Sequence, residues 1–466
     1  MTYKYDAVII GSGIGGSGVG ALLAHAGWKV LVLEKNGVIG GRCTSFKQGD
    51  FTIDLGMHNY AGGSLQLGDI CRLVNMPAAI EWISIRDGHN AVLQFGDNRG
   101  LFTKRGMLEL VKDESERKRL IDLFSAVVKL TDEDLEKLWY VPMSEWIDGF
   151  SKNPVVHLII DNLVGQYLCV PPHLASAHEF LKPFQLVLRD RLGGYPKGGN
   201  VSIPKAYIGA VEKYRGEVRL NSEVKNIIIE GSEAVGVRLV NGDEVRAPVV
   251  ISNADIKSTV KYLVGEDHFP GDYVRRIMSL TYSDPAVTLK VLLKEKVIDE
   301  YMVIYIPDEF HPTYTIAEDM RKGKVPKWVG AVSFITSNLD PSLAPEGKQW
   351  VSFVAACPAG QDWEKWEKVL LDNFYRVHPQ CKGRILRHYL ETPDWLDAWA
   401  GEGGSIIGIG QTVNQVHEHR PSAVSPIKGL YYCSADVGKT GIGTELAANS
   451  AIELFKVLSD GGSSNM

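Results

Sequence analysis

Three glycines near the start of the sequence have the spacing of a loop that holds a phosphate. Gly11, Gly13 and Gly16 fit the pattern G-x-G-x-x-G, and Glu34 lies 23 residues after Gly11. In such a loop the first glycine permits a tight turn, the second lets the backbone approach a pyrophosphate, and the third lets a helix pack closely on a strand. An acid about 20 residues further on accepts hydrogen bonds from a ribose 2′-hydroxyl. These residues therefore predict a site for a dinucleotide.

The elements that must position these residues occur in the required order. Residues 5–10 are a short apolar run, which is typical of a buried strand. Residues 17–26 predict a helix of small and apolar residues, whose N-terminus would offer free N–H groups to phosphates. Residues 28–33 predict a second strand that ends at Glu34, and this order favours a dinucleotide site over a glycine-rich turn without a ligand. Because an acid at this position disfavours a 2′-phosphate, NAD or FAD is favoured over NADP.

Two further segments indicate which dinucleotide is bound. Residues 40–42 read Gly-Gly-Arg, and residues 54–58 read Asp-Leu-Gly-Met-His. With these segments the sequence resembles the flavin-dependent amine oxidase superfamily, and within it the phytoene desaturase branch. The resemblance implies a permanently bound FAD, with Arg42 at its pyrophosphate and the segment around Gly56 beside the flavin.

Later segments extend the resemblance to the end of the chain. Residues 195–199 read Tyr-Pro-Lys-Gly-Gly, which in the family lies near the flavin, and Val224 would meet the adenine through backbone bonds. Asp436, at the end of a strand, would meet the ribityl and phosphate oxygens. The last helix would point its N-terminus at the flavin N1–C2=O edge, which is anionic in a reduced flavin. The residues expected to bind FAD are Gly11, Gly13, Ile14, Gly15, Gly16, Glu34, Lys35, Gly41, Arg42, Gly56, Met57, His58, Val224, Asn253, Asp436, Gly443 and Thr444.

The order of these segments predicts an α/β protein with two interleaved domains. A Rossmann-type FAD-binding domain, glutathione reductase-like, is expected from residues 1–75, 195–260 and 425–466. An α+β substrate domain would be inserted as residues 76–194 and 261–424. Periodicity and turn residues predict further elements: helices at 65–75, 108–138, 203–214 and 361–374, a helical region at 143–184 that is broken at Pro154 and at Pro171-Pro172, strands at 286–293 and 349–355, and a hairpin that turns at 241–242.

Length and composition exclude several classes of protein. The chain has 466 residues, enough for two or three domain-sized units, and its net charge of −6 gives no electrostatic case for nucleic acid. The six cysteines form no C-x-x-C pair, which fits reduced thiols in a cytoplasmic compartment. His417 and His419 lack further ligands for a metal.

No membrane-spanning segment or signal peptide is expected. The sequence has no run of 18 apolar residues, and residues 155–170 are expected to form a helix packed within the protein. The N-terminus enters a strand at once. The expected location is therefore cytoplasmic, and peripheral association with a membrane stays open.

Three residues near the expected flavin site differ from the family pattern. Glu445 stands where relatives that act on polyenes commonly have Pro, Lys439 stands where an apolar residue is common, and His58 follows the Asp-x-Gly segment. These three residues would be catalytic if they move a proton while FAD moves a hydride, and they would also suit a substrate with a polar or carbonyl end. Glu445 could equally be an acid that stabilises the dipole of its helix.

The resemblance implies an FAD-dependent oxidoreductase that forms, reduces or shifts a C=C bond in a largely apolar, isoprenoid- or lipid-like molecule. No second G-x-G-x-x-G follows a strand. Electrons would therefore pass through a diffusible acceptor or donor such as a quinone, O₂ or a redox protein, or the reaction would be redox-neutral overall. The aromatic residues between 139 and 184 either line an apolar tunnel or fill a core.

Two other functions remain as alternatives. The first is a flavin amine oxidase, although the C-terminal flavin segment lacks the aromatic residue that commonly helps to cage an amine in that group. The second is a prenyl-lipid escort protein of the Rab GDP-dissociation-inhibitor type, which shares the architecture without using flavin. Arg42, Asp436 and the glycines at 441 and 443 argue against the escort protein.

Overall fold

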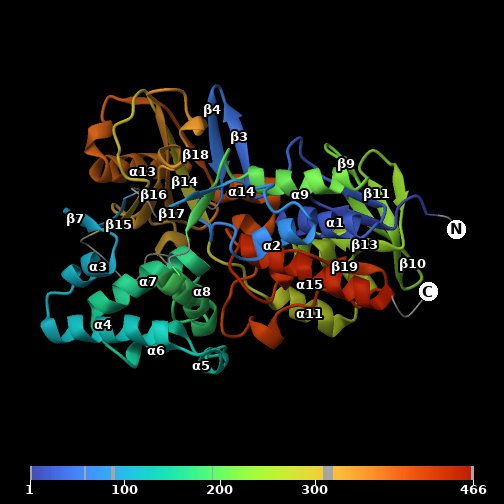
Figure 1. Cartoon of the computed structure of the whole chain (residues 1–466), viewed down its shortest axis with the longest axis horizontal. Helices are drawn as coiled ribbons and strands as arrows, with labels where there is room; N and C mark the ends of the chain where they lie inside the picture. Colours follow the sequence, from blue (N-terminus) through green and yellow to red (C-terminus); the bar gives the residue numbers. More distant parts are fainter. Residues whose placement is uncertain (1–2, 57–58, 86–89, 191–192, 308–318, 463–466) are drawn as a thin grey trace.

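The structure is a computed structural model that describes residues 3–56, 59–85, 90–190, 193–307 and 319–462. The chain forms two parts side by side (Figure 1). The part at the right of that view carries both termini, and the part at the left contains the long helices α4 and α13.

A parallel five-stranded sheet forms the centre of the part that carries the termini. Its strand order is β19-β13-β1-β2-β9, and β1 pairs in parallel with both β13 and β2. Strands from the beginning, middle and end of the sequence thus meet in one sheet: β1 (Ala7–Ile10), β2 (Val30–Leu33), β9 (Glu217–Arg219), β13 (Val249–Ser252) and β19 (Leu430–Tyr432).

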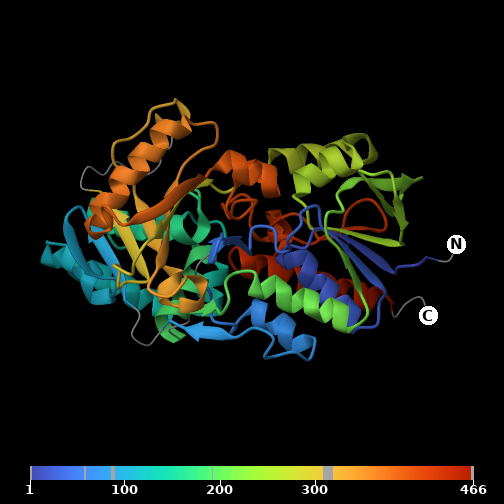
Figure 2. The same ribbon diagram turned by 90° about the horizontal axis from the view of Figure 1, so that it is seen from above.

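Alternate residues of β1 pack into the layers on opposite faces of this sheet. Ala7 and Ile9 share a core with four helices, α1 (Ile14–His25), α2 (Gln66–Leu73), α9 (Ser202–Lys213) and α15 (Thr444–Gly462). Val8 and Ile10 share a core with a small antiparallel sheet of β10 (Val224–Glu230), β11 (Glu233–Leu239) and β12 (Glu244–Arg246). Figure 2 shows α1 and α9 together on one side of the five strands. This arrangement is the predicted Rossmann-type fold.

The segment that follows β13 also belongs to this part. It contains α10 (Ile256–Ser258), a π-helical turn (Thr259–Val264) and α11 (Gly271–Ser279). Val260, Phe269 and Ile277 are buried in the same core as Val8 and Ile10. The domain boundary expected at residue 260 therefore falls inside this layer, because the apolar residues that follow it pack beneath the five-stranded sheet.

A seven-stranded sheet forms the centre of the other part. Its order is β18-β14-β17-β16-β15-β6-β7, and β6 pairs in parallel with β15 although more than 200 residues separate them. The strands are β6 (Ala91–Phe95), β7 (Asn98–Leu101), β14 (Ala286–Leu293), β15 (Met302–Ile306), β16 (Ala331–Phe334), β17 (Gln349–Ala356) and β18 (Ile385–Glu391). Both segments predicted for the substrate domain thus contribute to this sheet.

Helices cover both faces of the seven-stranded sheet. Helix α13 (Trp363–Val377) packs Trp366 and Phe374 on one face. Six helices form the layer on the other: α3 (Lys104–Leu110), α4 (Glu114–Lys129), α5 (Asp132–Glu136), α6 (Met143–Asp148), α7 (Pro154–Leu168) and α8 (Ala177–Asp190). The region 108–138 was expected to be helical throughout, but new helices begin where Asp113 and Thr131 cap α4 and α5.

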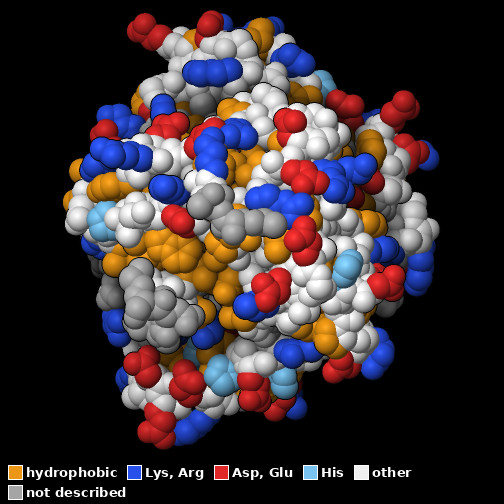
Figure 3. Space-filling view, turned by 90° about the vertical axis from the view of Figure 1, so that its right-hand side faces the viewer, with side chains coloured by type: hydrophobic (Ala, Val, Ile, Leu, Met, Phe, Trp, Pro, Cys, Tyr) orange, Lys and Arg blue, Asp and Glu red, His pale blue; other side chains and the backbone are white. Residues whose placement is uncertain are grey.

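Short elements connect the two parts. They are the hairpin of β3 (Thr44–Gln48) and β4 (Phe51–Leu55), the pair of β5 (Trp82–Ser84) and β8 (Gly194–Pro196), and helix α14 (Pro393–Ala400). None of the described helices is long and apolar enough to cross a membrane. The same ranges contain no cluster of three or more His, Cys, Asp or Glu side chains that could hold a metal. The face in Figure 3 carries both signs of charge, interspersed with hydrophobic side chains.

Candidate active site

A cavity of about 910 Å³ is lined by residues from both parts of the molecule. The residues expected to bind FAD that line it are Gly11, Gly13, Ile14, Gly15, Glu34, Lys35, Gly41, Arg42, Gly56, Val224, Asn253, Gly443 and Thr444. Apolar residues of α7, α8 and the seven-stranded sheet line it as well, among them Leu163, Tyr167, Leu186, Val187, Met302, Val332 and Phe334. Its volume lies in the upper part of the range of about 300–1,000 Å³ that is usual for ligand sites.

The glycine turn packs closely at the start of α1. A Cβ atom on Gly16 would lie 2.2 Å from the carbonyl oxygen of Gly11, so only glycine allows the helix to approach the strand here. Gly13 precedes the first residue of α1, and no side chain caps the helix. The N–H groups of the first turn therefore remain for an anion at the cavity wall, as a pyrophosphate requires.

Asn253 lies across the glycine turn. A Cβ atom on Gly13 would come within 2.6 Å of Asn253 Oδ1, and Asn253 Nδ2 donates a hydrogen bond of 2.5 Å to the carbonyl oxygen of Cys433. A side chain at position 13 would therefore collide with Asn253 as well as with the expected pyrophosphate.

Glu34 is fixed at the cavity wall by its neighbours. Its Oε2 accepts hydrogen bonds from the backbone N–H and the hydroxyl of Ser12, at 2.9 and 2.7 Å. Its Oε1 accepts one from the N–H of Asn36, at 2.9 Å. A carboxylate oxygen can accept two hydrogen bonds, so Oε1 can accept a second one from a ribose hydroxyl.

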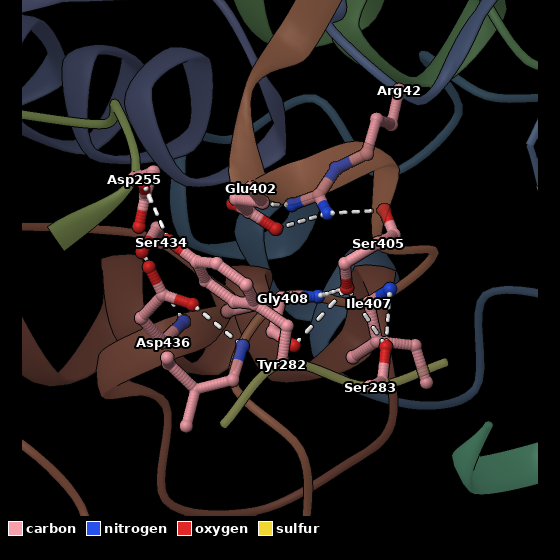
Figure 4. Close-up of polar contacts among 12 residues, drawn as sticks. Arg42, Asp255, Tyr282, Ser283, Glu402, Ser405, Ile407, Gly408, Ser434 and Asp436 are labelled. Carbon is pink, nitrogen blue, oxygen red and sulfur yellow. Dashed lines mark hydrogen bonds and ion pairs between the residues drawn. The ribbon is translucent and has the colours of Figure 1, made fainter. Parts of the chain in front are cut away.

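The guanidinium of Arg42 pairs with the buried Glu402 (Figure 4). Both terminal nitrogens of Arg42 donate to the carboxylate of Glu402, and one also donates to the carbonyl oxygen of Ser405 at 3.1 Å. Burial raises the pKa of Glu402 to about 8, against the lowering effect of Arg42, and the nearby charge of Asp436 raises it further. Arg42 is therefore already paired where the phosphates of FAD are expected.

Asp436 is completely buried, and it is not among the described residues that line the cavity. Its two oxygens accept hydrogen bonds from the N–H groups of Ile409 and Ile256, at 3.0 and 3.1 Å. Burial and the nearby Asp255 raise its pKa. Asp436 thus ties three distant segments together, and its contact with the ribityl and phosphate oxygens stays a prediction.

Glu445 lines the cavity and has one unpaired oxygen. It is 7% exposed, and its Oε2 accepts a hydrogen bond of 2.9 Å from the N–H of Leu67, in the first turn of α2. Oε1 has no hydrogen-bond partner among the described residues. Burial raises the pKa of Glu445 to about 7. The carboxyl group therefore caps a neighbouring helix and can also exchange a proton near neutral pH.

The structure does not bring Lys439 to Glu445 in the cavity. Its side chain is exposed, it is not among the described residues that line the cavity, and its N–H donates to Asn449 Oδ1 at 2.9 Å. The preceding Gly438 packs so tightly that a Cβ there would lie 2.2 Å from the carbonyl oxygen of Leu446. The position of Lys439 therefore does not support the catalytic role expected for it. Met57 and His58 lie outside the described residues, so their roles stay predictions.

Lys290 of β14 also lines the cavity, although it was not predicted as a site residue. This side chain is 1% exposed, donates to the hydroxyl of Ser352 at 2.8 Å and to the carbonyl oxygen of Asp54, and lies 3.3 Å from Glu391 Oε2. Burial raises the pKa of Glu391, and Lys290 opposes this effect. Only the single Lys in the apolar run 286–293 marks this position in the sequence.

The uncapped start of α1, the anchored Glu34 and the glycine turn fit a dinucleotide. That Arg42 contacts its phosphates stays a prediction. The fold and this site fit a protein that binds FAD. The model of the family described as flavin containing amine oxidoreductase matches residues 20–453, and the chain belongs to this family.

Several relatives carry named activities. The chain is 27% identical to all-trans-retinol 13,14-reductase from Danio rerio, in an alignment that covers 93% of this chain and 82% of the relative. It is 28% identical to the chloroplastic prolycopene isomerase from Daucus carota, over 96% and 79%. It is 24% identical to phytoene desaturase from Fusarium fujikuroi, over 99% and 90%. The predicted superfamily and branch are confirmed.

Solved structures share the fold at lower identity. An oxidoreductase from Methanosarcina mazei has a TM-score of 0.74 and is 18% identical, and the match covers 97% of this chain and 99% of that protein. Putrescine oxidase bound to putrescine has a TM-score of 0.74 and is 14% identical, over 98% and 99%. These structures confirm the predicted fold class.

Proposed function

We propose that this enzyme forms, reduces or shifts a carbon–carbon double bond in a largely apolar, isoprenoid-like molecule. The observation that carries the proposal is the cavity. Residues expected to hold FAD, such as Gly11 and Glu34, line it together with apolar side chains of α7, α8 and the seven-stranded sheet. A long apolar substrate could thus reach a flavin without leaving the protein.

The apolar wall suits a substrate that offers few polar groups. Leu163 of α7, Val187 of α8 and Phe334 of β16 are among its residues. For such a molecule, catalysis depends on holding the reacting carbons in position rather than on many hydrogen bonds. The names of the relatives support this substrate class, because they refer to reduction of retinol, isomerisation of prolycopene and desaturation of phytoene.

In this proposal Glu445 transfers the proton that accompanies the hydride. FAD supplies hydride exchange at its N5 atom when it is bound. Because burial brings the pKa of Glu445 to about 7, both protonation states are populated near neutral pH. Glu445 can therefore donate a proton in a reduction, accept one in a desaturation, or do both in turn in an isomerisation.

Lys290 acts as a positioning residue in this proposal. Its ammonium group holds the carbonyl of Asp54 and the carboxylate of Glu391, and all three groups are nearly or completely buried. Asp54 lies two residues before Gly56, which is expected beside the flavin. Lys290 thereby links the seven-stranded sheet to the segment that would contact the flavin.

We also propose that electrons enter or leave through a diffusible quinone, O₂ or a redox protein, since the sequence offers no second dinucleotide site. A flavin amine oxidase is the second candidate. The observation that favours an amine oxidase is Asp161, a partly buried acid on the cavity wall that could pair with the ammonium group of an amine.

The proposal is tested with the FAD-loaded protein under anaerobic conditions. Retinol, prolycopene, phytoene and putrescine are incubated with a dithionite-reduced flavin, and separately with an oxidised flavin and a quinone. Mass spectrometry and chromatography then detect the gain of two hydrogens, their loss, or a change of isomer. A double-bond change in any of the first three substrates supports the proposal. Turnover of putrescine alone, with no change in the others, would exclude it.

A further inference from the structure

A buried glutamine connects α8 with the loop that leads into α15. The Nε2 atom of Gln411 donates hydrogen bonds to Glu179 Oε2 at 2.6 Å and to the carbonyl oxygen of Gly441 at 3.0 Å. A side-chain amide nitrogen carries two hydrogens, so these two acceptors use its full donor capacity. Gln411 therefore joins two segments that are far apart in the sequence.

The backbone around Gln411 is fixed to the same region of α8. The carbonyl oxygen of Gln411 accepts a hydrogen bond of 3.1 Å from the N–H of Ser176, directly before α8 begins. The next residue, Thr412, pairs with Ala175 in an isolated bridge. Because its main chain and its side chain both contact the start of α8, Gln411 has little freedom to turn away from Gly441.

The loop that Gln411 contacts has a backbone that glycine adopts most readily. Gly441 has a φ of 106° and Gly443 has a φ of 55°, and residues with side chains rarely adopt such values. Glycine also brings no side chain of its own that could anchor the loop. Contacts from other segments must therefore fix this loop, and the hydrogen bond from Gln411 to the carbonyl oxygen of Gly441 is one of them.

Gly441 packs directly against Glu445. A Cβ atom on Gly441 would lie 3.0 Å from the carbonyl carbon of Glu445 and 3.1 Å from its Cβ atom. The carboxyl group of Glu445 accepts a hydrogen bond from the N–H of Leu67. Glu445 is thus held between the start of α2 and the glycine loop. Its position in the cavity therefore depends on the position of Gly441.

The other end of this connection belongs to the apolar wall of the cavity. Glu179 precedes Pro183, Leu186 and Val187 by four, seven and eight residues, so the four residues share one side of α8. The last three line the cavity. Pro183 has no N–H group to donate to the carbonyl oxygen of Glu179. The hydrogen bond between Glu179 and Gln411 thus holds α8 at a turn that lacks one backbone bond.

We propose that Gln411, anchored by Glu179, is a positioning residue that holds Glu445 in place for proton transfer. The inference rests on the proposed function, in which Glu445 transfers the proton. Gln411 is not among the described residues that line the cavity, and it acts through Gly441. It keeps Glu445 in a fixed position relative to the wall that would contact the hydrocarbon.

The test compares Gln411→Leu with Gln415→Leu in the FAD-loaded full chain. Gln415 lies in the same segment and is also buried, but it bonds to Thr281 and Gly410 instead of Gly441. It is therefore a matched control for the loss of a buried amide. Crystal structures of the wild type and both variants give the positions of the glycine loop and of Glu445. Steady-state kinetics use whichever of retinol, prolycopene and phytoene the enzyme converts.

In Gln411→Leu we expect the loop at Gly441 to shift and Glu445 to lose its hydrogen bond from the N–H of Leu67. A displacement of about 1 Å of a catalytic group can reduce the rate by about 10²-fold. The kcat should therefore fall by about tenfold or more, while KM and FAD content stay nearly unchanged. Gln415→Leu should keep the position of Glu445 and the wild-type kcat, even if its melting temperature falls.

Two variants of Glu179 provide an independent comparison that decides the question if Gln411→Leu fails to fold. Glu179→Leu offers no acceptor to Gln411 Nε2, whereas Glu179→Gln keeps an oxygen in the same place. Glu179→Leu should therefore reduce kcat, and Glu179→Gln should retain most of it.

The outcomes separate this inference from the proposed function. An unshifted Glu445 in Gln411→Leu overturns the inference and leaves the proposed double-bond chemistry intact. An equal loss of kcat in Gln415→Leu also overturns it, because general loosening would then explain both variants. A shifted Glu445 with full turnover supports the positioning by Gln411 and contradicts proton transfer by Glu445. If no substrate is converted, the proposed function fails, and the crystal structures still decide whether Gln411 positions Glu445.

Discussion

Arg42 and Glu402 bind each other through both terminal guanidinium nitrogens and both carboxylate oxygens, although 360 residues separate them. Arg42 is expected at the pyrophosphate of FAD, so Glu402 and the phosphates compete for one cation. Glu402 adopts a left-handed backbone conformation with φ of 65°, which is uncommon for a residue other than glycine. The protein thus holds an acid in an unfavourable conformation beside the cofactor site.

The first prediction is that FAD binding weakens as the pH rises through about 8. Below this pH Glu402 is mostly protonated in the apoprotein, because its pKa is raised to about 8. The negative charge of bound FAD favours the protonated form of Glu402 further. Above pH 8, binding of FAD is therefore coupled to protonation of Glu402. The dissociation constant for FAD should then increase up to about tenfold per pH unit. Quenching of flavin fluorescence at pH 7, 8 and 9 measures it.

Glu402→Gln should bind FAD with little dependence on pH, because the neutral amide does not titrate. Glu453→Gln, which removes the partly exposed partner of Lys456, is the matched control and should keep the wild-type dependence. An unchanged pH profile in Glu402→Gln would show that another group takes up the proton.

A second prediction separates the two functions of the glycine turn. Gly13→Val should abolish FAD binding, and loss of the cofactor should lower the melting temperature of the protein as purified. Gly16→Ala should already destabilise the apoprotein, because its Cβ would lie 2.2 Å from a backbone oxygen. Gly209→Ala in α9, where a Cβ meets nothing within 4 Å, is the control and should keep FAD. Normal flavin content in Gly13→Val would disprove the prediction that the glycine turn binds the pyrophosphate of FAD.

The N-terminal part of the candidate FAD site could be predicted because its residues are close in the sequence. The strand, the glycine turn and the helix at residues 5–26 form one local unit, and Glu34 ends the next strand. Gly13 and Glu34 both line the cavity, and their contacts with FAD stay predictions. Short-range patterns of this kind predict a site because the backbone of one unit fixes its geometry.

The pairs made by tertiary packing were not predictable in this way. Nothing in the local pattern joins Lys290 to Glu391 or Arg42 to Glu402, since the fold alone brings these segments together. Lys439 illustrates the converse. It is six residues from Glu445 in the sequence, but the tightly packed Gly438 precedes an exposed side chain outside the cavity lining.

A third prediction concerns the buried pair of Lys290 and Glu391. Lys290→Met should destabilise the protein by about 3–5 kcal/mol, because it leaves Glu391 buried without a partner. Lys290→Met combined with Glu391→Leu should recover much of this loss, as measured by urea unfolding. The double variant should still turn over poorly if Lys290 positions the Asp54 segment. Full activity in a stable double variant would show that the pair has no part in the reaction.

The fourth prediction decides the role of Glu445. Glu445→Gln retains an acceptor for the N–H of Leu67, so the cap on α2 should survive and FAD should still bind. If Glu445 moves the proton, turnover should fall by roughly 10²–10⁴-fold. If it is only a helix cap, turnover should stay nearly intact, whereas Glu445→Ala should cost about 0.5–2 kcal/mol of stability. Steady-state kinetics and thermal unfolding of both variants distinguish these outcomes.

The pH dependence of stability provides an independent check on Glu445. Its pKa is raised to about 7 from an ordinary value of 4.5, so the folded state binds the proton more tightly than the unfolded state. The resulting stabilisation is fully present below pH 4.5 and is lost as the pH rises to about 7, at up to about 1.4 kcal/mol per unit. Glu445→Gln should therefore reduce the fall in apoprotein stability between pH 5 and 7. If the stability of the variant falls as steeply as that of the wild type, another residue is responsible for the pH dependence.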